Sequence, residues 1–190
     1  MDKFSKINKV TKVEDVDNVL YSNDHMKLID IDEWTAIVEP DSVVCIPYLI
    51  EQNQFLLRKE WIPSYKYVDG HDFHLTVISG SVEEGESIEV ALIREIEEEA
   101  GLVLRGNVKL EFEKPLFVSK SSVAKYNICI LPLSEKDYDE VAIKGDGSKF
   151  EDQSKTVKLD AKYISNVDAS DLITEYMLIK LKTYLNVSSR

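Results

Sequence analysis

Residues 80–102 read GSVEEGESIEVALIREIEEEAGL, a glycine-punctuated loop followed by an acidic helix. Glu95, Glu98 and Glu99 are spaced i, i+3 and i+4, so their side chains converge on one helical face. Three carboxylates packed together repel one another, and a helix gains nothing from this arrangement unless a positive charge lies among them. The set therefore predicts a hard divalent cation with oxygen ligands, Mg²⁺ in the first place and Mn²⁺ as its substitute. A solvated acidic helix face is the alternative interpretation.

The same segment carries signals for both ends of its helix. Ser87 is expected to cap the start, with Glu89 in the positive first turn, and Gly101 is expected to end it. An apolar stripe lies beside the carboxylates and consists of Leu92, Ile93, Ile96 and Ala100. The helix can therefore pack on a sheet through this stripe and present its glutamates to a cleft.

The segment also resembles the signature of the Nudix hydrolases, G-x5-E-x7-R-E-U-x-E-E-x-G-U, where U is an aliphatic residue. Every defined position matches, through Gly80, Glu86, Arg94, Glu95, Ile96, Glu98, Glu99, Gly101 and Leu102. The resemblance implies an α+β fold, an α/β/α sandwich with a mixed central β-sheet, the loop-helix-loop of the box and a C-terminal helix. It also implies a hydrolase of phosphoric anhydride bonds, and it adds the backbone carbonyl of Ser79 to the three glutamates as a metal ligand.

The other residues of the box have roles that follow from their chemistry. Arg94 cannot coordinate a cation, so we expect it to hold Glu95 or Glu86 in position through paired hydrogen bonds. Glu86 is expected to be a structural partner at the end of the loop, with membership of a metal cluster as the alternative. Gly80 and Gly85 are best explained by backbone conformations that side chains would obstruct.

Hydrolysis also needs a general base. In relatives that cleave ADP-ribose, this base comes from an acidic loop before a late strand, and the resemblance points to Glu151, just ahead of a predicted strand at 156–159. Asp152, Asp146 and Glu95 itself are the competing candidates. A loop whose acids are merely solvated is the other interpretation, since residues 134–154 form a long polar connection.

Composition limits the class of protein. The chain has 190 residues, 44% of them hydrophobic, which suits one domain with a small appendage. Its net charge of −12 disfavours nonspecific nucleic-acid binding and docking on anionic membranes. The Nudix resemblance implies a small nucleotide as the partner. Cys45 and Cys129 lie in apolar runs without a CxxC pattern, which favours buried thiols in a reducing cytoplasm over a single disulfide. Neither a signal peptide nor a membrane span is expected.

The remaining pattern predicts strands around one central helix and a second helix near the end. The expected strands are 26–31, 34–39, 43–50, 54–58, 73–78, 116–118, 126–133 and 156–159, with 43–50 and 54–58 forming a hairpin. Residues 171–185 have helical spacing and are expected to cover the sheet. We therefore divide the chain into an N-terminal extension, 1–39, and a Nudix domain, 40–190. By family analogy, the extension and Trp34 are expected to take part in a homodimer.

The substrate is indicated by a weaker resemblance. Residues 43–65, VVCIPYLIEQNQFLLRKEWIPSY, resemble the strand pair of ADP-ribose and nucleoside-diphosphate-sugar pyrophosphatases. The implied reaction cleaves a nucleoside diphosphate linked to another moiety into a nucleoside monophosphate and a phosphorylated product. Dinucleoside polyphosphates, NADH or capped RNA are alternative substrates, and a non-catalytic nucleotide sensor is the alternative function. The candidate substrate contacts are Arg58 and Lys59 for phosphate, Lys120 or Lys125 on the far wall of the cleft, and Trp34 or Trp61 for stacking on a base.

Overall fold

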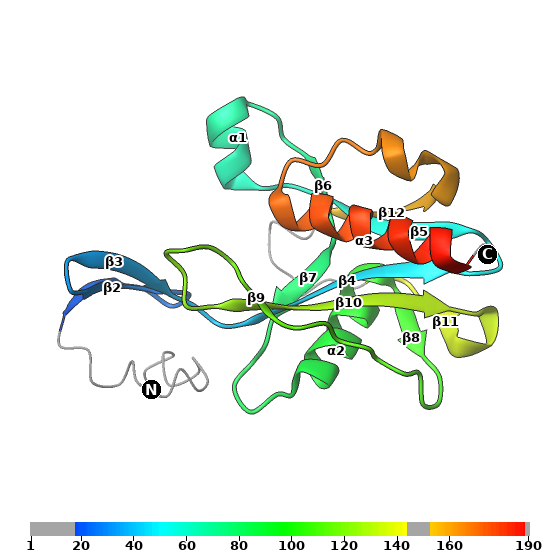
Figure 1. Ribbon diagram of the computed structural model, residues 1–190, viewed down its shortest axis with the longest axis horizontal. Helices are drawn as coiled ribbons and strands as arrows, with labels where there is room; N and C mark the ends of the chain where they lie inside the picture. The colour runs from blue at the N-terminus through cyan, green and yellow to red at the C-terminus, as the bar shows by residue number, and fades with distance from the viewer. Residues whose placement is uncertain (1–17, 144–152, 189–190) are drawn as a thin grey trace.

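A mixed sheet lies at the centre of the computed structural model, which describes residues 18–143 and 153–188. Within these ranges the sheet has seven strands (Figure 1). Its main path is β12 (Lys155–Asp160), β5 (Gln54–Glu60), β4 (Ser42–Leu49), β10 (Lys125–Leu133) and β9 (Leu116–Phe117). The pair of β10 and β4 is parallel, whereas the other pairs are antiparallel.

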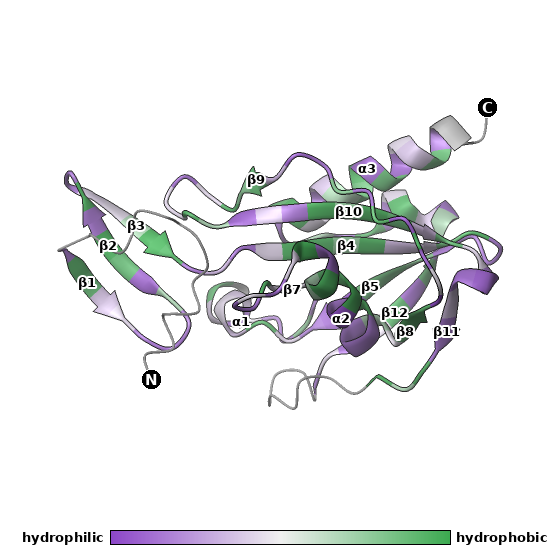
Figure 2. Ribbon diagram, turned by 90° about the horizontal axis from the view of Figure 1, so that it is seen from below, coloured by the Kyte–Doolittle hydropathy of each residue, from purple (hydrophilic) through white to green (hydrophobic). Residues whose placement is uncertain are grey.

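Two helices cover opposite faces of this sheet (Figure 1). Because side chains alternate along a strand, Val43 and Cys45 of β4 pack toward α2 (Ile88–Ala100), while Val44 and Ile46 pack toward α3 (Leu172–Ser188). All residues of β4 from 43 to 49 are buried, as expected for a strand covered on both faces, and Figure 2 shows hydrophobic colour along much of the strand. The fold is therefore the predicted α/β/α sandwich of the α+β class.

The predicted boundaries of α2 are confirmed. The side chain of Ser87 accepts a hydrogen bond from the backbone N–H of Val90, and Gly101 ends the helix with a φ of 64°. The stripe is narrower than predicted, because Ile93 is 41% exposed. Ile93 lies one residue, or about 100°, beyond Leu92, which turns it away from the sheet.

The run predicted as one strand at 73–78 is two strands. β6 (His74–Thr76) pairs with β5, and β7 (Ile78–Ser81) pairs with β4. The change of partner is possible because β4 and β5 pair only at the end near their hairpin, at Tyr48 with Phe55 and Leu49 with Gln54. Beyond these positions the two strands diverge, and β6 and β7 occupy the space between them.

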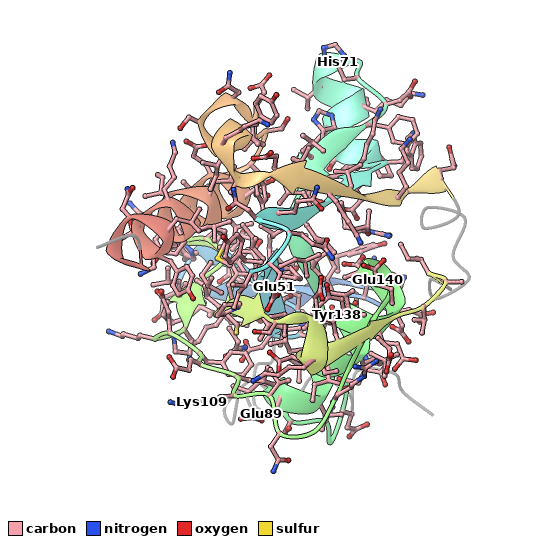
Figure 3. The ribbon with its side chains drawn as sticks, turned by 90° about the vertical axis from the view of Figure 1, so that its right-hand side faces the viewer. Glu51, His71, Glu89, Lys109, Tyr138 and Glu140 are labelled. Carbon is pink, nitrogen blue, oxygen red and sulfur yellow. The ribbon has the colours of Figure 1, made fainter. Side chains whose placement is uncertain are left out.

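Several short elements were not predicted. They are α1 (Pro63–Asp69), β8 (Leu102–Leu104), β11 (Tyr138–Glu140) and the 3-10 helices η3 (Glu135–Asp137) and η5 (Ala161–Asn166). β11 pairs with β8, so the polar connection after residue 133 begins with ordered structure. Glu51 and Tyr138 lie at the end of the molecule that contains β11 (Figure 3). Glu51 accepts a hydrogen bond from the N–H of Glu135, which anchors η3 to the β4–β5 turn.

A small antiparallel sheet projects from the opposite end of the sandwich (Figures 1 and 2). It consists of β1 (Val19–Ser22), β2 (Lys27–Ile31) and β3 (Trp34–Val38); the prediction missed β1. The backbone of Ile37 in β3 hydrogen-bonds to the loop after β9 through Ser121 and Val123. This sheet is therefore attached to the sandwich by one edge, and much of it remains exposed.

Two further sequence expectations concern membranes and cysteines. None of the helices in the described part of the chain is long and apolar enough to span a membrane. Cys45 and Cys129 are opposite each other on β4 and β10, and both are buried free thiols, as predicted.

Candidate active site

Arg94 joins the loop and the helix of residues 80–102. Its guanidinium donates a pair of hydrogen bonds to Glu86, each 3.1 Å long, and a third of 3.0 Å to the carbonyl of Ser81. Its Nη1 atom donates to Oε1 of Glu95 at 2.5 Å and to Oε2 of Glu98 at 3.3 Å. The prediction left open whether Arg94 binds Glu95 or Glu86, and the structure places it against both. The paired hydrogen bonds hold the pKa of Glu86 below its usual range.

Gly80 lies so close to Glu95 that a side chain would not fit between them. A Cβ placed on Gly80 would be 1.8 Å from Oε1 of Glu95. The space for this carboxylate, and not an unusual backbone angle, therefore explains why position 80 is glycine. The predicted conformational reason applies instead at Gly85, where φ is 79° and the space around the Cα is open.

Glu99 is the most deeply held of the three carboxylates. Its Oε2 accepts a hydrogen bond of 3.1 Å from the N–H of Ser79, and its Oε1 lies 3.2 Å from Nε of Arg58. Burial raises the pKa of Glu99 to about 8, and the charge of Glu95 adds to the rise, although Arg58 opposes it. A further positive charge beside this carboxyl would lower its pKa again.

The three glutamates supply the hard oxygen donors that Mg²⁺ prefers. Glu95 and Glu99 keep only 9% and 7% of their side chains exposed, whereas Glu98 keeps 34%, so Glu98 opens the set to solvent. In residues 18–143 and 153–188, however, no three acidic, histidine or cysteine side chains are grouped closely enough to hold an ion. Arg58 and Arg94 supply the positive charge among these carboxylates. The three carboxylates are therefore of the ligand type that Mg²⁺ prefers. In this structure Arg58 and Arg94 hold them in place.

Comparison with known proteins identifies the family in which this arrangement occurs. Residues 39–141, more than half of the chain, match the family model described as NUDIX domain. The chain belongs to the Nudix family. It is therefore a hydrolase of phosphoric anhydride bonds, in a family whose members generally use a divalent metal.

A solved structure described as the crystal structure of ADP compounds hydrolase has the same fold. Its TM-score is 0.66 over 91% of this chain and 93% of that chain, with 16% sequence identity. At this identity, the likeness shows the Nudix fold alone. No curated protein sequence matches the chain.

The residues predicted to contact substrate lie in different places around the Nudix box. Arg58 is 1% exposed and lies under Glu99, which differs from the open position that a phosphate contact needs. Lys59 is exposed, and its Nζ lies 5.3 Å from the centre of the Phe73 ring. Arg58 and Lys59 point to opposite sides because they are neighbours on one strand.

The predicted aromatic contacts are far apart in the fold. Trp34 is 56% exposed on β3 of the projecting sheet. Trp61 follows β5 and its backbone N–H donates to Ser154. Lys120 is exposed in the turn after β9, and Lys125 lies with its Nζ 5.2 Å from the centre of the Phe117 ring. Trp61 thus follows a strand of the central sheet, whereas Trp34 belongs to the projecting sheet.

The candidate bases Glu151, Asp152 and Asp146 lie outside the described residues. The strand that follows them, β12, is joined to the Nudix helix, because the hydroxyl of Thr156 donates to the backbone carbonyl of Glu99. Glu95, the remaining candidate, is held by Arg94.

Sequence reasoning missed the pocket beside Ser79. This pocket has a volume of about 430 Å³ and lies between α1, β9, β10 and the start of α3. Its acidic and aromatic lining consists of Glu60, Tyr65, Phe117, Tyr126, Asp171 and Tyr176. These residues come from separate segments of the chain, so no local sequence motif predicts that they lie together.

Proposed function

We propose that the chain is a Mg²⁺-dependent pyrophosphatase of the ADP-ribose or nucleotide-sugar type. It cleaves a nucleoside diphosphate linked to another moiety into a nucleoside monophosphate and a phosphorylated product. The observation that carries the proposal is the position of Ser79, which hydrogen-bonds to Glu99 and also lines the pocket. A diphosphate held at the box would therefore direct one of its substituents into this pocket, whose volume suits a small-molecule site.

The metal would be held by Glu95, Glu98, Glu99 and the carbonyl of Ser79. When bound, such an ion neutralises phosphate charge and lowers the pKa of a coordinated water. Arg94 has the role of positioning Glu95 and Glu98, since it contacts both carboxylates while Glu86 anchors its other side. Arg58 balances part of the charge of Glu99 from below.

Glu151 is the proposed general base, with Asp152, Asp146 and Glu95 as alternatives. The support comes from β12, which begins at Lys155 opposite Lys59 and reaches the Nudix helix through Thr156. Glu151 lies four residues before this strand in the sequence, so it is close in sequence to Thr156, which contacts the Nudix helix. Exchange of Glu151 for Gln should lower turnover and leave the affinity for Mg²⁺ nearly unchanged.

The substrate side of the proposal assigns Lys59 and Lys120 to phosphate and Trp61 to the base. Arg58 and Trp34 remain the less favoured members of this set, since one is buried and the other lies on the projecting sheet. The similar solved structure is described as an ADP compounds hydrolase, which is compatible with a substrate that contains a nucleoside diphosphate.

Residues 1–39 are the proposed dimer element, and 40–190 the catalytic domain. The support is the exposed apolar surface of the projecting sheet, where Val19, Leu20, Tyr21 and Trp34 are each at least 50% exposed. Sedimentation of the purified protein would test the homodimer directly. A cytoplasmic location is part of the same proposal and is supported by the two free thiols.

Glu98→Gln is the decisive test of the catalytic assignment. In the presence of Mg²⁺ and ADP-ribose, it should lower turnover by at least about 100-fold, because it removes a charged oxygen donor. Glu97→Gln is the matched control, since Glu97 is the exposed neighbour on the same helix and its exchange changes the net charge equally. Chromatography of the products would measure both. Equal turnover of Glu98→Gln and Glu97→Gln would contradict the metal assignment.

A further inference from the structure

The pocket beside Ser79 exists because the sheet opens at this point. β4 and β5 separate beyond their hairpin, and the chain changes from β6 to β7 at Val77. The N–H of Val77 donates to the hydroxyl of Thr174, which joins this junction to the first turn of α3. The pocket thus lies between a strand junction and a helix start, next to the site proposed for the diphosphate.

Two carboxylates from distant segments line this pocket. Oε2 of Glu60 accepts a hydrogen bond of 2.9 Å from the hydroxyl of Thr76. Oδ1 of Asp171 accepts a hydrogen bond of 2.8 Å from the N–H of Thr174, while its Oδ2 is buried and accepts none from the described residues. A buried carboxylate oxygen without a donor is costly, so Asp171 brings incompletely compensated negative charge to the wall of the pocket.

Cationic side chains are absent from the described lining of the pocket. Among the described residues that line it, none is Lys or Arg. Four aromatic residues line the same pocket as the two carboxylates, namely Tyr65, Phe117, Tyr126 and Tyr176. Burial and then the charge of Asp171 raise the pKa of both Tyr65 and Tyr126, which indicates that the negative field extends across the pocket. Such a lining repels a phosphate or an acidic sugar.

We propose that this pocket binds a positively charged group that the substrate carries beyond its diphosphate, and that Glu60 and Asp171 select for its charge. The group is either a cationic heteroaromatic ring or a quaternary ammonium, because both combine attraction to carboxylates with contact to aromatic faces. The inference rests on the proposed function for the position of the diphosphate. It adds the class of substrate, which neither the box nor the family match defines.

The test uses small probes without phosphate, so that it does not depend on hydrolysis. Binding of 1-methylnicotinamide, a cationic ring, and of uncharged nicotinamide to the full chain is compared by ligand-observed NMR titration. The cation should bind at least about 5-fold more tightly. Choline provides a second arm: stronger binding of choline assigns the pocket to quaternary ammonium groups, and stronger binding of 1-methylnicotinamide assigns it to cationic rings.

Asp171→Asn and Glu60→Gln should each weaken the binding of the preferred cation by at least about 5-fold and change nicotinamide binding little. Asn also caps helices, and Gln can still accept from Thr76, so both variants should fold. Glu175→Gln is the matched control, because Glu175 is exposed on the first turn of α3 and does not line the pocket. Its cation binding should equal that of the wild type.

Two outcomes would overturn the inference. One is binding of nicotinamide as tight as that of both cations, and the other is unchanged cation binding in both pocket variants. A parallel assay of hydrolysis, with ADP-ribose and with nucleoside diphosphates that carry a cationic group, keeps the two proposals apart. Hydrolysis without selective cation binding contradicts the pocket assignment alone, whereas selective binding without hydrolysis of any nucleotide contradicts the proposed function alone.

Discussion

The Nudix helix and the pocket beside Ser79 handle negative charge in opposite ways. At the helix, arginines lie against the carboxylates: Arg94 contacts Glu95 and Glu98, and Arg58 lies beside Glu99. In the pocket, Asp171 keeps a buried oxygen that accepts no hydrogen bond from the described residues. The first arrangement holds its carboxylates in place for a shared ligand. The second has no cationic side chain in its described lining, so a ligand that brings its own positive charge would be favoured there.

The largest effect is expected from Arg94→Lys, which removes the guanidinium that holds the carboxylates of the Nudix helix. A lysine cannot make the paired hydrogen bonds to Glu86 while also contacting Glu95 and Glu98. Turnover of ADP-ribose at saturating Mg²⁺ should fall by about 1,000-fold, an effect comparable with loss of a catalytic group. Steady-state kinetics would measure it. Arg105→Lys, which alters an exposed pair with Asp139, is the control and should stay within about twofold of the wild type; similar rates for the two variants would contradict the role of Arg94.

Gly80→Ala should follow, with a loss of about 100-fold in turnover. The new Cβ would occupy the space of Oε1 of Glu95 and displace this carboxylate from Arg94. Gly85→Ala tests the alternative that any glycine of the loop is equally sensitive. There the cost is backbone strain of about 1 kcal/mol, because the space around the Cα is open. Melting curves and kinetics of both variants would separate the effects, and equal turnover in the two would count against the steric explanation.

The pH dependence of stability should show a smaller effect. The pKa of Glu99 is raised from 4.5 to about 8 on folding, so its contribution to stability is present below pH 4.5 and is lost as the pH rises toward 8. Unfolding in EDTA should therefore become easier between pH 5 and pH 8, by on the order of 2 kcal/mol after relaxation of the site. Glu99→Gln should remove this slope. Addition of Mg²⁺ at pH 8 should make the wild-type protein more stable again. If Glu99→Gln shows the same dependence of unfolding free energy on pH as the wild type, another group titrates.

Thr156→Val should have the smallest effect. It removes the hydrogen bond from β12 to the backbone carbonyl of Glu99 and retains the shape of the side chain. The expected cost is about 1 kcal/mol of unfolding free energy, together with a modest loss of turnover. Thr183→Val, at an exposed position on α3, serves as the control in urea unfolding. A variant at position 156 as stable as the wild type would show that this hydrogen bond contributes nothing measurable.

The accuracy of prediction differed between these regions for a physical reason. The caps at Ser87 and Gly101 were predictable because helix ends are satisfied by residues close in sequence. The split of residues 73–78 into β6 and β7 was not, since it depends on where β4 and β5 diverge. The burial of Arg58 was missed in the same way: its strand position is local, but its partner Glu99 comes from a helix that begins 30 residues later in the chain.

By itself, the sequence determined the family, the helix of the box and the identity of its three carboxylates, because these depend on spacing within one continuous segment. Only the tertiary structure decided which arginine holds which carboxylate and how the pocket is lined. Glu60 and Asp171 are more than a hundred residues apart, and folding alone brings them to one cavity. Interactions between distant segments leave no periodic or local signature, so they become visible only when the sheet and its two covering helices are assembled.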